Sequence, residues 1–292
     1  ARTTVLNFEE LARLARIFAD LGVRRIRLTG GEPLLRPGVS GLARTLVALP
    51  GIQTVGLTTN GLRLAEEAAA LRSAGISGVN VSLDTLREDR FYQITRVRGL
   101  SRVLDGIKAA RDAGLATVKL NMVVMRGIND DEILDLADFA FDHGLTLRFI
   151  ELMRVTPMWR PEFFVPIEAV QRICARRYGL RRVNEPGFGP SQYYRAPAGT
   201  LGFIQTSVHN CRHCRRLRLT SWGEVKVCLY EAAGVDVGDL LRRRVSDELI
   251  ADILRVRMAE KQQVSFQDWP QGTVQMSRSE ERRVGKECRS RW

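Results

Sequence analysis

Hydrophobic positions follow two alternating periods from the start of the chain to about residue 155. Segments such as 8–22 and 101–114 place apolar residues at helical spacing, and short apolar runs rich in β-branched residues separate such segments. The runs predicted to be strands are 24–30, 54–60, 78–84, 117–125 and 145–152. Strands that alternate with helices at this spacing form βαβ crossovers, so the pattern predicts an α/β fold with a parallel sheet, either barrel or open.

Each predicted strand ends in a polar or charged cluster. Ligands of parallel β/α folds bind at the carboxyl ends of the strands, so we expect these clusters to share one cavity. The clusters are Thr29–Glu32, Thr58–Asn60, Ser82–Asp84, Asn121 and Glu151.

The pattern changes after Arg154, where prolines punctuate a loop and residues 184–200 are rich in glycine and proline. We therefore expect a first domain at 1–155 and a second at 156–275, with a helical stretch at 237–261. Residues 276–292 have no periodicity and no apolar face, and they resemble a non-native tail from vector read-through. This tail is left out of the fold prediction.

Composition narrows the class of protein without choosing a function. A chain of 292 residues with 45% hydrophobic residues can bury a large core. No apolar run reaches the roughly 18 residues of a membrane span, which predicts a cytoplasmic protein. Of the net charge of +12, +3 lies in residues 278–292. The remaining charge suits nucleic acid or a cleft for a phosphate-bearing ligand equally well.

Five cysteines without a secretion signal make disulfides unexpected. Cys174 lies in a helical pattern and is predicted to be a core residue. Cys211, Cys214 and Cys228 form a C-x2-C-x13-C pattern. His209 or His213 could complete a zinc site, whereas an iron–sulfur cluster could be held by the three thiolates with one iron open. Spacing alone leaves zinc, a cluster and coincidence open.

Basic and glycine positions supply further candidates. Arg216 and Arg218 would face the same side of a strand and could hold a triphosphate, or simply form an exposed basic face. The Gly30-Gly31-Glu32-Pro33 turn allows close approach of a ligand to the backbone, although a simple turn is the rival interpretation.

Two residues in or next to the apolar strands, Lys119 and Met153, need separate interpretation. Lys119 lies in an otherwise apolar strand, where a lysine is costly unless it enters a polar cavity, is paired, or extends to solvent at the strand edge. Met153 is a core residue on pattern alone.

Several segments together resemble the GTP 3',8-cyclase family of radical S-adenosylmethionine (SAM) enzymes, over about residues 6–272. They are IRLTGGEPLLR, TTNG, NVSLDTL, KLNMVVMRGIND, RFIELM, and C-x2-C-R-R-L-R-L-T with the later cysteine. The resemblance implies a lyase that uses SAM to convert GTP to 3',8-cyclo-7,8-dihydro-GTP in molybdenum cofactor (molybdopterin) biosynthesis. It also implies a partial (β/α)6 TIM-like barrel with a C-terminal cluster-binding domain, and two [4Fe-4S] clusters.

The resemblance assigns roles residue by residue. It implies SAM contacts at Gly31, Ser82, Met153 and Glu32, which replaces the core interpretation of Met153. It implies GTP contacts at Arg27, Thr58, Lys119, Arg216, Leu217 and Arg218. It makes Cys211, Cys214 and Cys228 the ligands of a substrate-side [4Fe-4S] cluster, whose open iron would face the purine of GTP.

The sequence departs from the family pattern in three places. The C-x3-C-x2-C motif that binds the SAM cluster is absent, so we expect a copy without the first barrel strand and its cluster loop, which does not turn over. No catalytic residue is assignable for the same reason. The family ends in Gly-Gly where this chain has its foreign-looking tail, and Arg215 stands where the family usually has asparagine.

The resemblance also implies partners. Cyclic pyranopterin monophosphate synthase would act next in the pathway, the electron donor is not identified, no membrane or nucleic acid is expected, and a homodimer is left open. Two alternatives remain: a zinc-stabilised basic module that binds nucleic acid, and a radical-SAM relative with another substrate.

Overall fold

The computed structural model describes residues 5–154, 156, 158–183, 190–206, 216–228, 231 and 233–263. The chain forms two compact units that interleave in sequence. Unit 1 comprises Ala1–Ile26, Gly41–Thr54 and His209–Trp292, and unit 2 comprises Arg27–Ser40 and Val55–Val208. Neither unit ends at residue 155, where the pattern of the sequence changes. The predicted tail at 276–292 lies outside the described residues.

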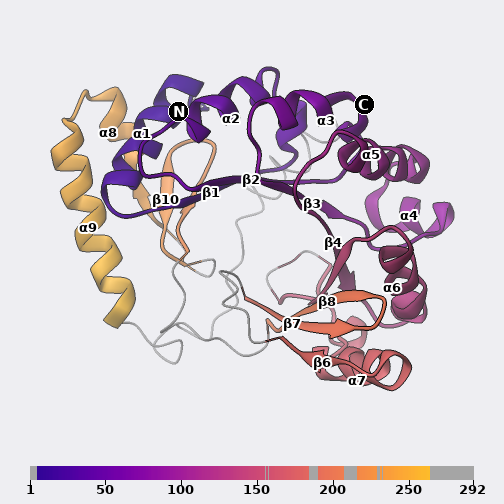
Figure 1. The fold of residues 1–292 in the computed structure, drawn as a ribbon. Coiled ribbons are helices and arrows are strands. Elements are labelled where there is room, and N and C mark those ends of the chain that lie inside the picture. The colour runs from indigo at the N-terminus through magenta and orange to yellow at the C-terminus, as the bar shows by residue number, and fades with distance from the viewer. Residues whose placement is uncertain are drawn as a thin grey trace. The chain divides into compact units, whose positions relative to one another are not determined.

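Helices and strands alternate through the first half of the described chain (Figure 1). The helices are α1 (Phe8–Asp20), α2 (Val39–Val47), α3 (Leu64–Ser73), α4 (Glu88–Thr95), α5 (Leu100–Asp112), α6 (Ile133–Asp142), α7 (Ile167–Tyr178), α8 (Val237–Arg242) and α9 (Asp247–Gln263), with short 3-10 turns η1 (Pro33–Leu35), η2 (Asp130–Glu132) and η3 (Pro161–Phe163). The strands are β1 (Arg25–Leu28), β2 (Thr54–Thr59), β3 (Gly78–Ser82), β4 (Val118–Val124), β5 (Thr146–Glu151), β6 (Arg181–Arg182), β7 (Ser191–Ala196), β8 (Gly199–Ile204), β9 (Arg218–Leu219), β10 (Glu224–Lys226) and β11 (Val235–Asp236).

The main sheet has the strand order β1-β2-β3-β4-β5-β8-β7-β6. Strands β2 to β5 pair in parallel and in sequence order, and β8 continues the parallel sheet beside β5. Strands β7 and β6 then pair antiparallel at the end of the sheet. The predicted α/β fold with a parallel sheet is confirmed, and all five predicted strands are present as β1 to β5.

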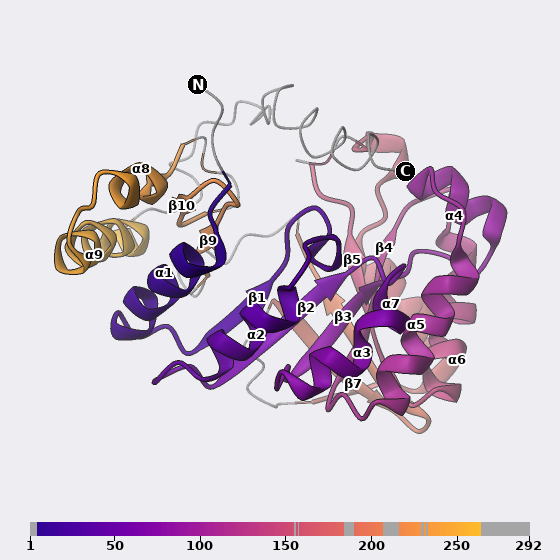
Figure 2. The same cartoon turned by 90° about the horizontal axis from the view of Figure 1, so that it is seen from above.

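Buried and half-buried residues alternate along β4, because helices cover one face of the sheet and leave the other face open. In β4, Val118, Leu120, Met122 and Val124 are buried, and the residues between them are half-buried. Side chains alternate across a strand, so the buried set packs under the helices and the other set lies on the opposite face. Figures 1 and 2 show α3, α5 and α6 along the outer, convex side of β3, β4 and β5. The concave side of unit 2 therefore carries the partly exposed polar residues.

Close packing of α3 against α5 depends on a glycine. A Cβ at Gly106 would lie 2.7 Å from the carbonyl oxygen of Gly61 and 3.0 Å from Cβ of Leu64. Overpacking of this kind costs about 1–3 kcal/mol, so Gly106→Ala is expected to lower the free energy of unfolding by about 2 kcal/mol. Chemical denaturation followed by circular dichroism measures the change.

Gly41 in α2 is the matched control, because a Cβ there meets nothing within 4 Å. Gly41→Ala is expected to be neutral or stabilising by up to about 1 kcal/mol, since alanine favours the helix. A Gly106→Ala protein as stable as the Gly41→Ala protein would rule out the close approach.

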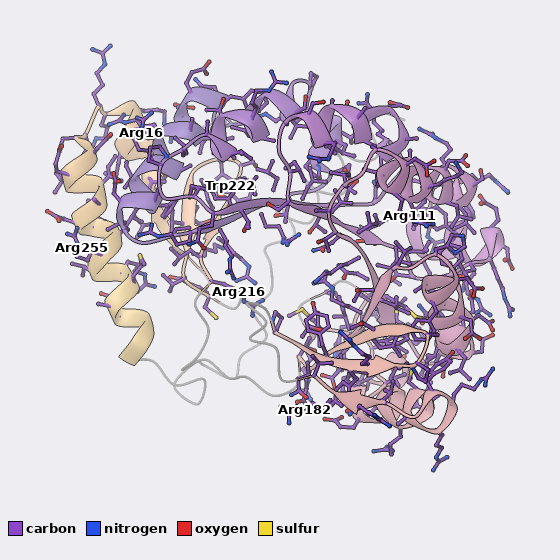
Figure 3. All side chains as sticks on the ribbon, viewed as in Figure 1. Arg16, Arg111, Arg182, Arg216, Trp222 and Arg255 are labelled. Atoms are coloured by element: carbon purple, nitrogen blue, oxygen red, sulfur yellow. The ribbon has the colours of Figure 1, made fainter. Side chains whose placement is uncertain are left out.

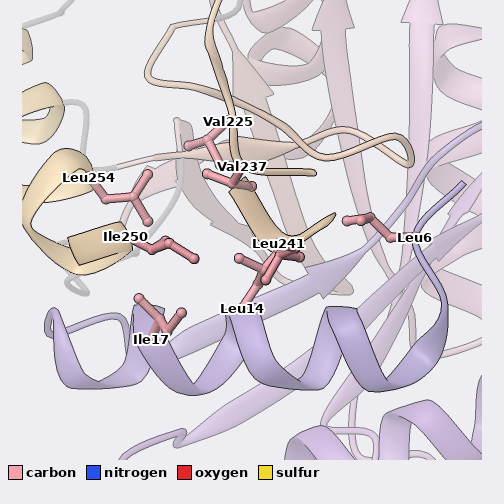
Figure 4. Packing of buried hydrophobic residues seen from close by; sticks show 8 residues of the cluster. All are labelled: Leu6, Leu14, Ile17, Val225, Val237, Leu241, Ile250 and Leu254. Carbon is pink, nitrogen blue, oxygen red and sulfur yellow. The ribbon is translucent and has the colours of Figure 1, made fainter. Parts of the chain in front are cut away.

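Unit 1 packs helix α1 and the described elements after residue 216 around an apolar cluster (Figure 4). Its buried members are Leu6, Leu14, Ile17, Val225, Val237, Leu241, Ile250 and Leu254. Helix α1 begins with a capping box, in which Asn7 Oδ1 accepts from the Glu10 amide and the Glu10 carboxylate accepts from the Asn7 amide. Arg13 then donates to Asp247 Oδ1 at 2.6 Å and to the Val245 carbonyl at 2.8 Å. The first helix thus packs with the C-terminal segment.

Within the described part of the chain, no helix is long and apolar enough to cross a membrane. The predicted helical stretch at 237–261 forms two helices, α8 and α9, separated at Arg243–Ser246.

Candidate active site

The concave face of unit 2 brings three predicted GTP-contact residues onto one side of the sheet. Parallel register aligns Thr58 with Asn80 and Asn80 with Lys119, so these side chains form one row across β2, β3 and β4. Arg27 lies on β1 beside this row, and its Nη1 donates to the Leu57 carbonyl at 3.3 Å. Gly56 makes room for it, because a Cβ at Gly56 would lie 3.1 Å from the guanidinium.

A second row lies next to the first. Register aligns Ser82 with Asn121, Asn121 with Arg148, Arg148 with Gly202, and Gly202 with Tyr193. Arg148 donates to Asn121 Oδ1 through Nε at 2.9 Å and through Nη2 at 2.6 Å. A guanidinium carries more N–H donors than these two, so Arg148 is oriented while it keeps donors for a ligand.

Lys119 is held against Tyr193 in the same region. Its Nζ lies 3.2 Å from the Tyr193 hydroxyl and 4.9 Å from the ring centroid. The lysine therefore faces a polar, aromatic environment, which resolves the alternatives that the strand pattern left open. Neither Arg148 nor Tyr193 was singled out from the sequence: Arg148 begins the RFIELM segment without an assigned role, and Tyr193 lies outside the motifs.

The electrostatics of this face favour anions. Partial desolvation lowers the pKa of Arg27, and the nearby charge of Arg148 lowers it further. Burial by itself would raise the pKa of Tyr193, but the positive charges of Lys119 and Arg148 outweigh it and hold this pKa below its usual value. Among the described residues, no carboxylate forms an ion pair with Arg27, Lys119 or Arg148. Within the described part of the chain, these three cations are therefore not neutralised by an ion pair.

The predicted SAM contacts lie at the carboxyl ends of the strands. Ser82 is exposed at the end of β3, and Met153 is half-buried just after β5. Gly31 is exposed, and the position of a Cβ there has nothing within 4 Å. Gly30 has φ +138°, which side-chain-bearing residues rarely adopt. The turn therefore leaves open space beside its backbone.

Glu32 has a structural role that the sequence did not reveal. Its Oε1 accepts from Thr59 Oγ1 at 2.7 Å and from the Leu34 amide at 3.1 Å, and its Oε2 accepts from the Asn60 amide at 2.7 Å. The carboxylate thus caps η1 and joins it to the end of β2. A carboxylate has about four acceptor sites, so one remains for the amine contact that the resemblance implies.

Asp84 lies two residues after β3, and the pKa of its carboxyl group is raised. Its Oδ1 accepts from the Val123 amide at 2.8 Å, and Asn129 Nδ2 donates to its carbonyl at 2.8 Å. Although the side chain is only half-buried, desolvation raises its pKa to about 6, and the hydrogen bond from Val123 opposes the shift. Perturbed carboxyl groups are common at functional sites.

One of the three clustered cysteines lies within the described residues. Cys228 is a half-buried free thiol just after β10, and such a soft donor suits an iron–sulfur cluster. Cys211 and Cys214 lie outside the described residues. Cys174 is fully buried, which confirms the prediction of a core residue, and burial raises the pKa of its thiol to about 12.

The basic segment after the second cysteine is only partly a strand. Strand β9 contains Arg218 and Leu219, and Arg216 precedes it, so the predicted alternation of Arg216 and Arg218 along one strand is wrong. Arg216 is exposed, whereas Leu217 and Arg218 are half-buried. Figure 3 shows the Arg216 side chain projecting from this segment of unit 1.

Comparisons with known proteins define the class first. Residues 2–140 match the radical SAM superfamily, and residues 145–266 match the molybdenum cofactor synthesis C family. The crystal structure of Streptococcus suis SuiB bound to S-adenosylmethionine superposes with a TM-score of 0.59 at 16% identity, covering 80% of this chain and 57% of that one. At this identity the likeness concerns the fold alone. The chain is thus a radical SAM enzyme by sequence, on a partial TIM-like barrel.

Curated relatives define the particular family. The GTP 3',8-cyclase of Pelotomaculum thermopropionicum is 44% identical over 264 residues, which cover 88% of this chain and 81% of the relative. The GTP 3',8-cyclase of Pseudomonas fluorescens is 47% identical over 248 residues, which cover 82% and 75%. The chain belongs to the GTP 3',8-cyclase family, whose enzymes act in molybdenum cofactor biosynthesis. These matches confirm the predicted family and do not favour a zinc-stabilised nucleic-acid-binding module.

Proposed function

We propose that the concave face of unit 2 binds GTP as the substrate of a SAM-dependent cyclisation. Arg27, Lys119 and Arg148 supply cationic donors for the phosphates, and Thr58 supplies a neutral hydroxyl beside them. The observation that carries this proposal is a set of three cations on one face of the sheet, none of which pairs with a carboxylate of the described residues. Guanidinium groups favour phosphate oxygens because they can donate two parallel hydrogen bonds.

Membership of the family also implies which residues contact the cofactors. Iron–sulfur clusters and SAM are the cofactors of the radical SAM class. In the family they supply the radical chemistry that starts the reaction, and residues 1–292 include no C-x3-C-x2-C motif for the SAM cluster. Gly31, Ser82, Met153 and Glu32 would contact SAM at the carboxyl ends of the strands, where the open backbone at Gly31 admits a ligand. Cys211, Cys214 and Cys228 would hold a [4Fe-4S] cluster, with Arg216, Leu217 and Arg218 contributing to GTP binding.

The fold prepares the site before GTP arrives. Tyr193 holds the Lys119 ammonium and Asn121 holds the Arg148 guanidinium, so little side-chain freedom remains to be lost on binding. The residues of this face thus bind the phosphates of GTP and restrict its orientation.

Replacing Lys119 with methionine tests this function. Methionine keeps most of the side-chain length and removes the charge, so Lys119→Met is expected to weaken GTP binding about 30-fold, or about 2 kcal/mol. Isothermal titration calorimetry with GTP measures the dissociation constant.

Lys108 on the outer helix α5 offers a matched control, since it is exposed and pairs with Asp112 at the surface. Lys108→Met is expected to change the dissociation constant less than about twofold. Equal GTP affinities for the Lys119→Met and Lys108→Met proteins would exclude this face as the nucleotide site.

A further inference from the structure

Glu231 is a buried carboxylate that lies three residues after the proposed cluster ligand Cys228. Only 3% of its surface is exposed. Its Oε2 accepts from the amide of Val227 at 2.8 Å and from the amide of Cys228 at 3.4 Å. The Glu231 amide in turn donates to the Cys228 carbonyl at 3.4 Å. The glutamate therefore contacts the backbone of Cys228 on both sides of its Cα.

The other oxygen of Glu231 is tied to helix α9. Its Oε1 accepts from Arg257 Nη2, and Arg257 Nη1 also donates to the exposed Glu260 one turn further along. Helix α9 is fixed in turn, because Ile250 and Leu254 lie in the buried cluster of unit 1 (Figure 4). The Cys228 turn is thus connected through two side chains to the core of its unit.

A buried carboxylate is a costly way to satisfy two amides. Removing an ionised group from water is unfavourable unless it is paired and hydrogen-bonded. A plain turn needs no such group, since water or a neutral side chain could accept the same two hydrogen bonds. The arrangement instead provides rigidity next to a thiol, and groups that support metal ligands are commonly arranged in this way.

We propose that Glu231, held by Arg257, is a positioning residue that fixes the direction of the Cys228 thiolate toward iron. This inference rests on the proposed function, in which Cys228 is a cluster ligand. Loss of the Glu231 carboxylate would leave the Val227 and Cys228 amides without their acceptor. The thiolate would then sample several directions, and the cluster would be released more readily.

The test measures cluster release from reconstituted protein. Absorbance loss after addition of an iron chelator gives a half-life, and electron paramagnetic resonance of the reduced cluster reports its environment. Glu231→Ala is expected to shorten the half-life about tenfold and to broaden the spectrum. Glu231→Gln keeps an acceptor oxygen for the two amides but turns an NH2 group toward Arg257, so it is expected to shorten the half-life only about threefold, as loss of the tether alone does.

Two matched variants separate positioning from stability. Glu260→Ala removes the other partner of Arg257 without touching the Cys228 turn, and it is expected to behave like the unmodified protein. Leu254→Ala destabilises the same unit from its core, and its cluster half-life is expected to change less than about twofold. A Leu254→Ala half-life as short as that of Glu231→Ala would overturn the inference.

If the Glu231→Ala protein does not fold, a further variant tests the same positioning role. Arg257→Met removes the tether and leaves the carboxylate in place, and it is expected to shorten the half-life about threefold. An unchanged half-life in this variant, or in a folded Glu231→Ala protein, refutes the positioning role.

The proposed function itself is tested separately by Cys228→Ala. If this variant binds as much iron as the unmodified protein, Cys228 is not a ligand and the cluster assignment fails. If Cys228→Ala loses iron while Glu231→Ala keeps a normal half-life, only the positioning role fails.

Discussion

Replacing Arg90 with leucine is expected to lower the melting temperature by about 10 °C. Arg90 donates to Glu132, which is only 1% exposed and also accepts from Thr85 Oγ1 at 2.6 Å and from the Leu86 amide at 2.8 Å. Without the Arg90 guanidinium, the buried Glu132 carboxylate keeps two neutral donors, the Thr85 hydroxyl and the Leu86 amide. Breaking a buried pair from one side costs about 3–5 kcal/mol, and each kcal/mol shifts the melting temperature by about 2–4 °C in a protein of this size.

The neighbouring Arg87 is the matched control for this prediction. It approaches Asp131 at 3.8 Å with both side chains about half exposed, so Arg87→Leu is expected to cost at most about 1 kcal/mol. Thermal unfolding followed by circular dichroism compares the two variants. The double variant Arg90→Leu, Glu132→Gln removes the uncompensated charge and is expected to recover at least half of the loss. A double variant less stable than Arg90→Leu would contradict the explanation.

Asp84→Asn is expected to stabilise the protein above pH 7 by about 2–3 kcal/mol and to leave its stability at pH 4 nearly unchanged. The pKa of Asp84 is about 6 in the folded protein and has an ordinary value of 3.8. One pKa unit corresponds to about 1.4 kcal/mol. The folded chain therefore holds this proton more tightly than the unfolded chain. The resulting stability is fully present below about pH 4 and is lost as the pH rises through about 6.

Asparagine is neutral at every pH and keeps an acceptor for the Val123 amide, so the variant isolates the ionisation. Chemical denaturation at a series of pH values measures the free energy of unfolding for both proteins. Asp142, exposed at the end of α6, gives the control Asp142→Asn, which is expected to follow the unmodified protein. Parallel pH profiles for Asp84→Asn and the unmodified protein would show that the carboxyl group is not desolvated.

The sequence allowed the main elements of the parallel sheet to be predicted because each has a strong local signal. Strand β4 is a run of apolar residues interrupted only by Lys119 and Asn121, and such a run predicts a strand packed against helices. The sequence left open whether Lys119 enters a polar cavity, is paired or extends to solvent, and its contact with Tyr193 came only from the structure. The family was also recognisable from the sequence, because its motifs are short runs of adjacent residues that require no knowledge of distant contacts.

Other parts of the site depend on contacts between distant segments. Tyr193 lies on β7, an antiparallel strand beyond the five predicted ones, and it contacts Lys119 74 residues earlier in the sequence. Glu32 looks like a ligand group in its turn, but its three donors show that it also holds the end of β2. No periodicity signals either contact, because each involves a single pair of side chains.

The sequence by itself determined the α/β class, the positions of the first five strands along the chain, the family and the candidate ligand residues, since all of these depend on local patterns. Only the tertiary structure decided that α1 packs with the C-terminal helices, and that Arg27, Lys119 and Arg148 carry no carboxylate partner among the described residues. The structure alone also showed that the Glu231 carboxylate accepts hydrogen bonds from the Val227 and Cys228 amides. Burial and charge compensation are properties of the folded neighbourhood, and residues far apart in the chain supply that neighbourhood.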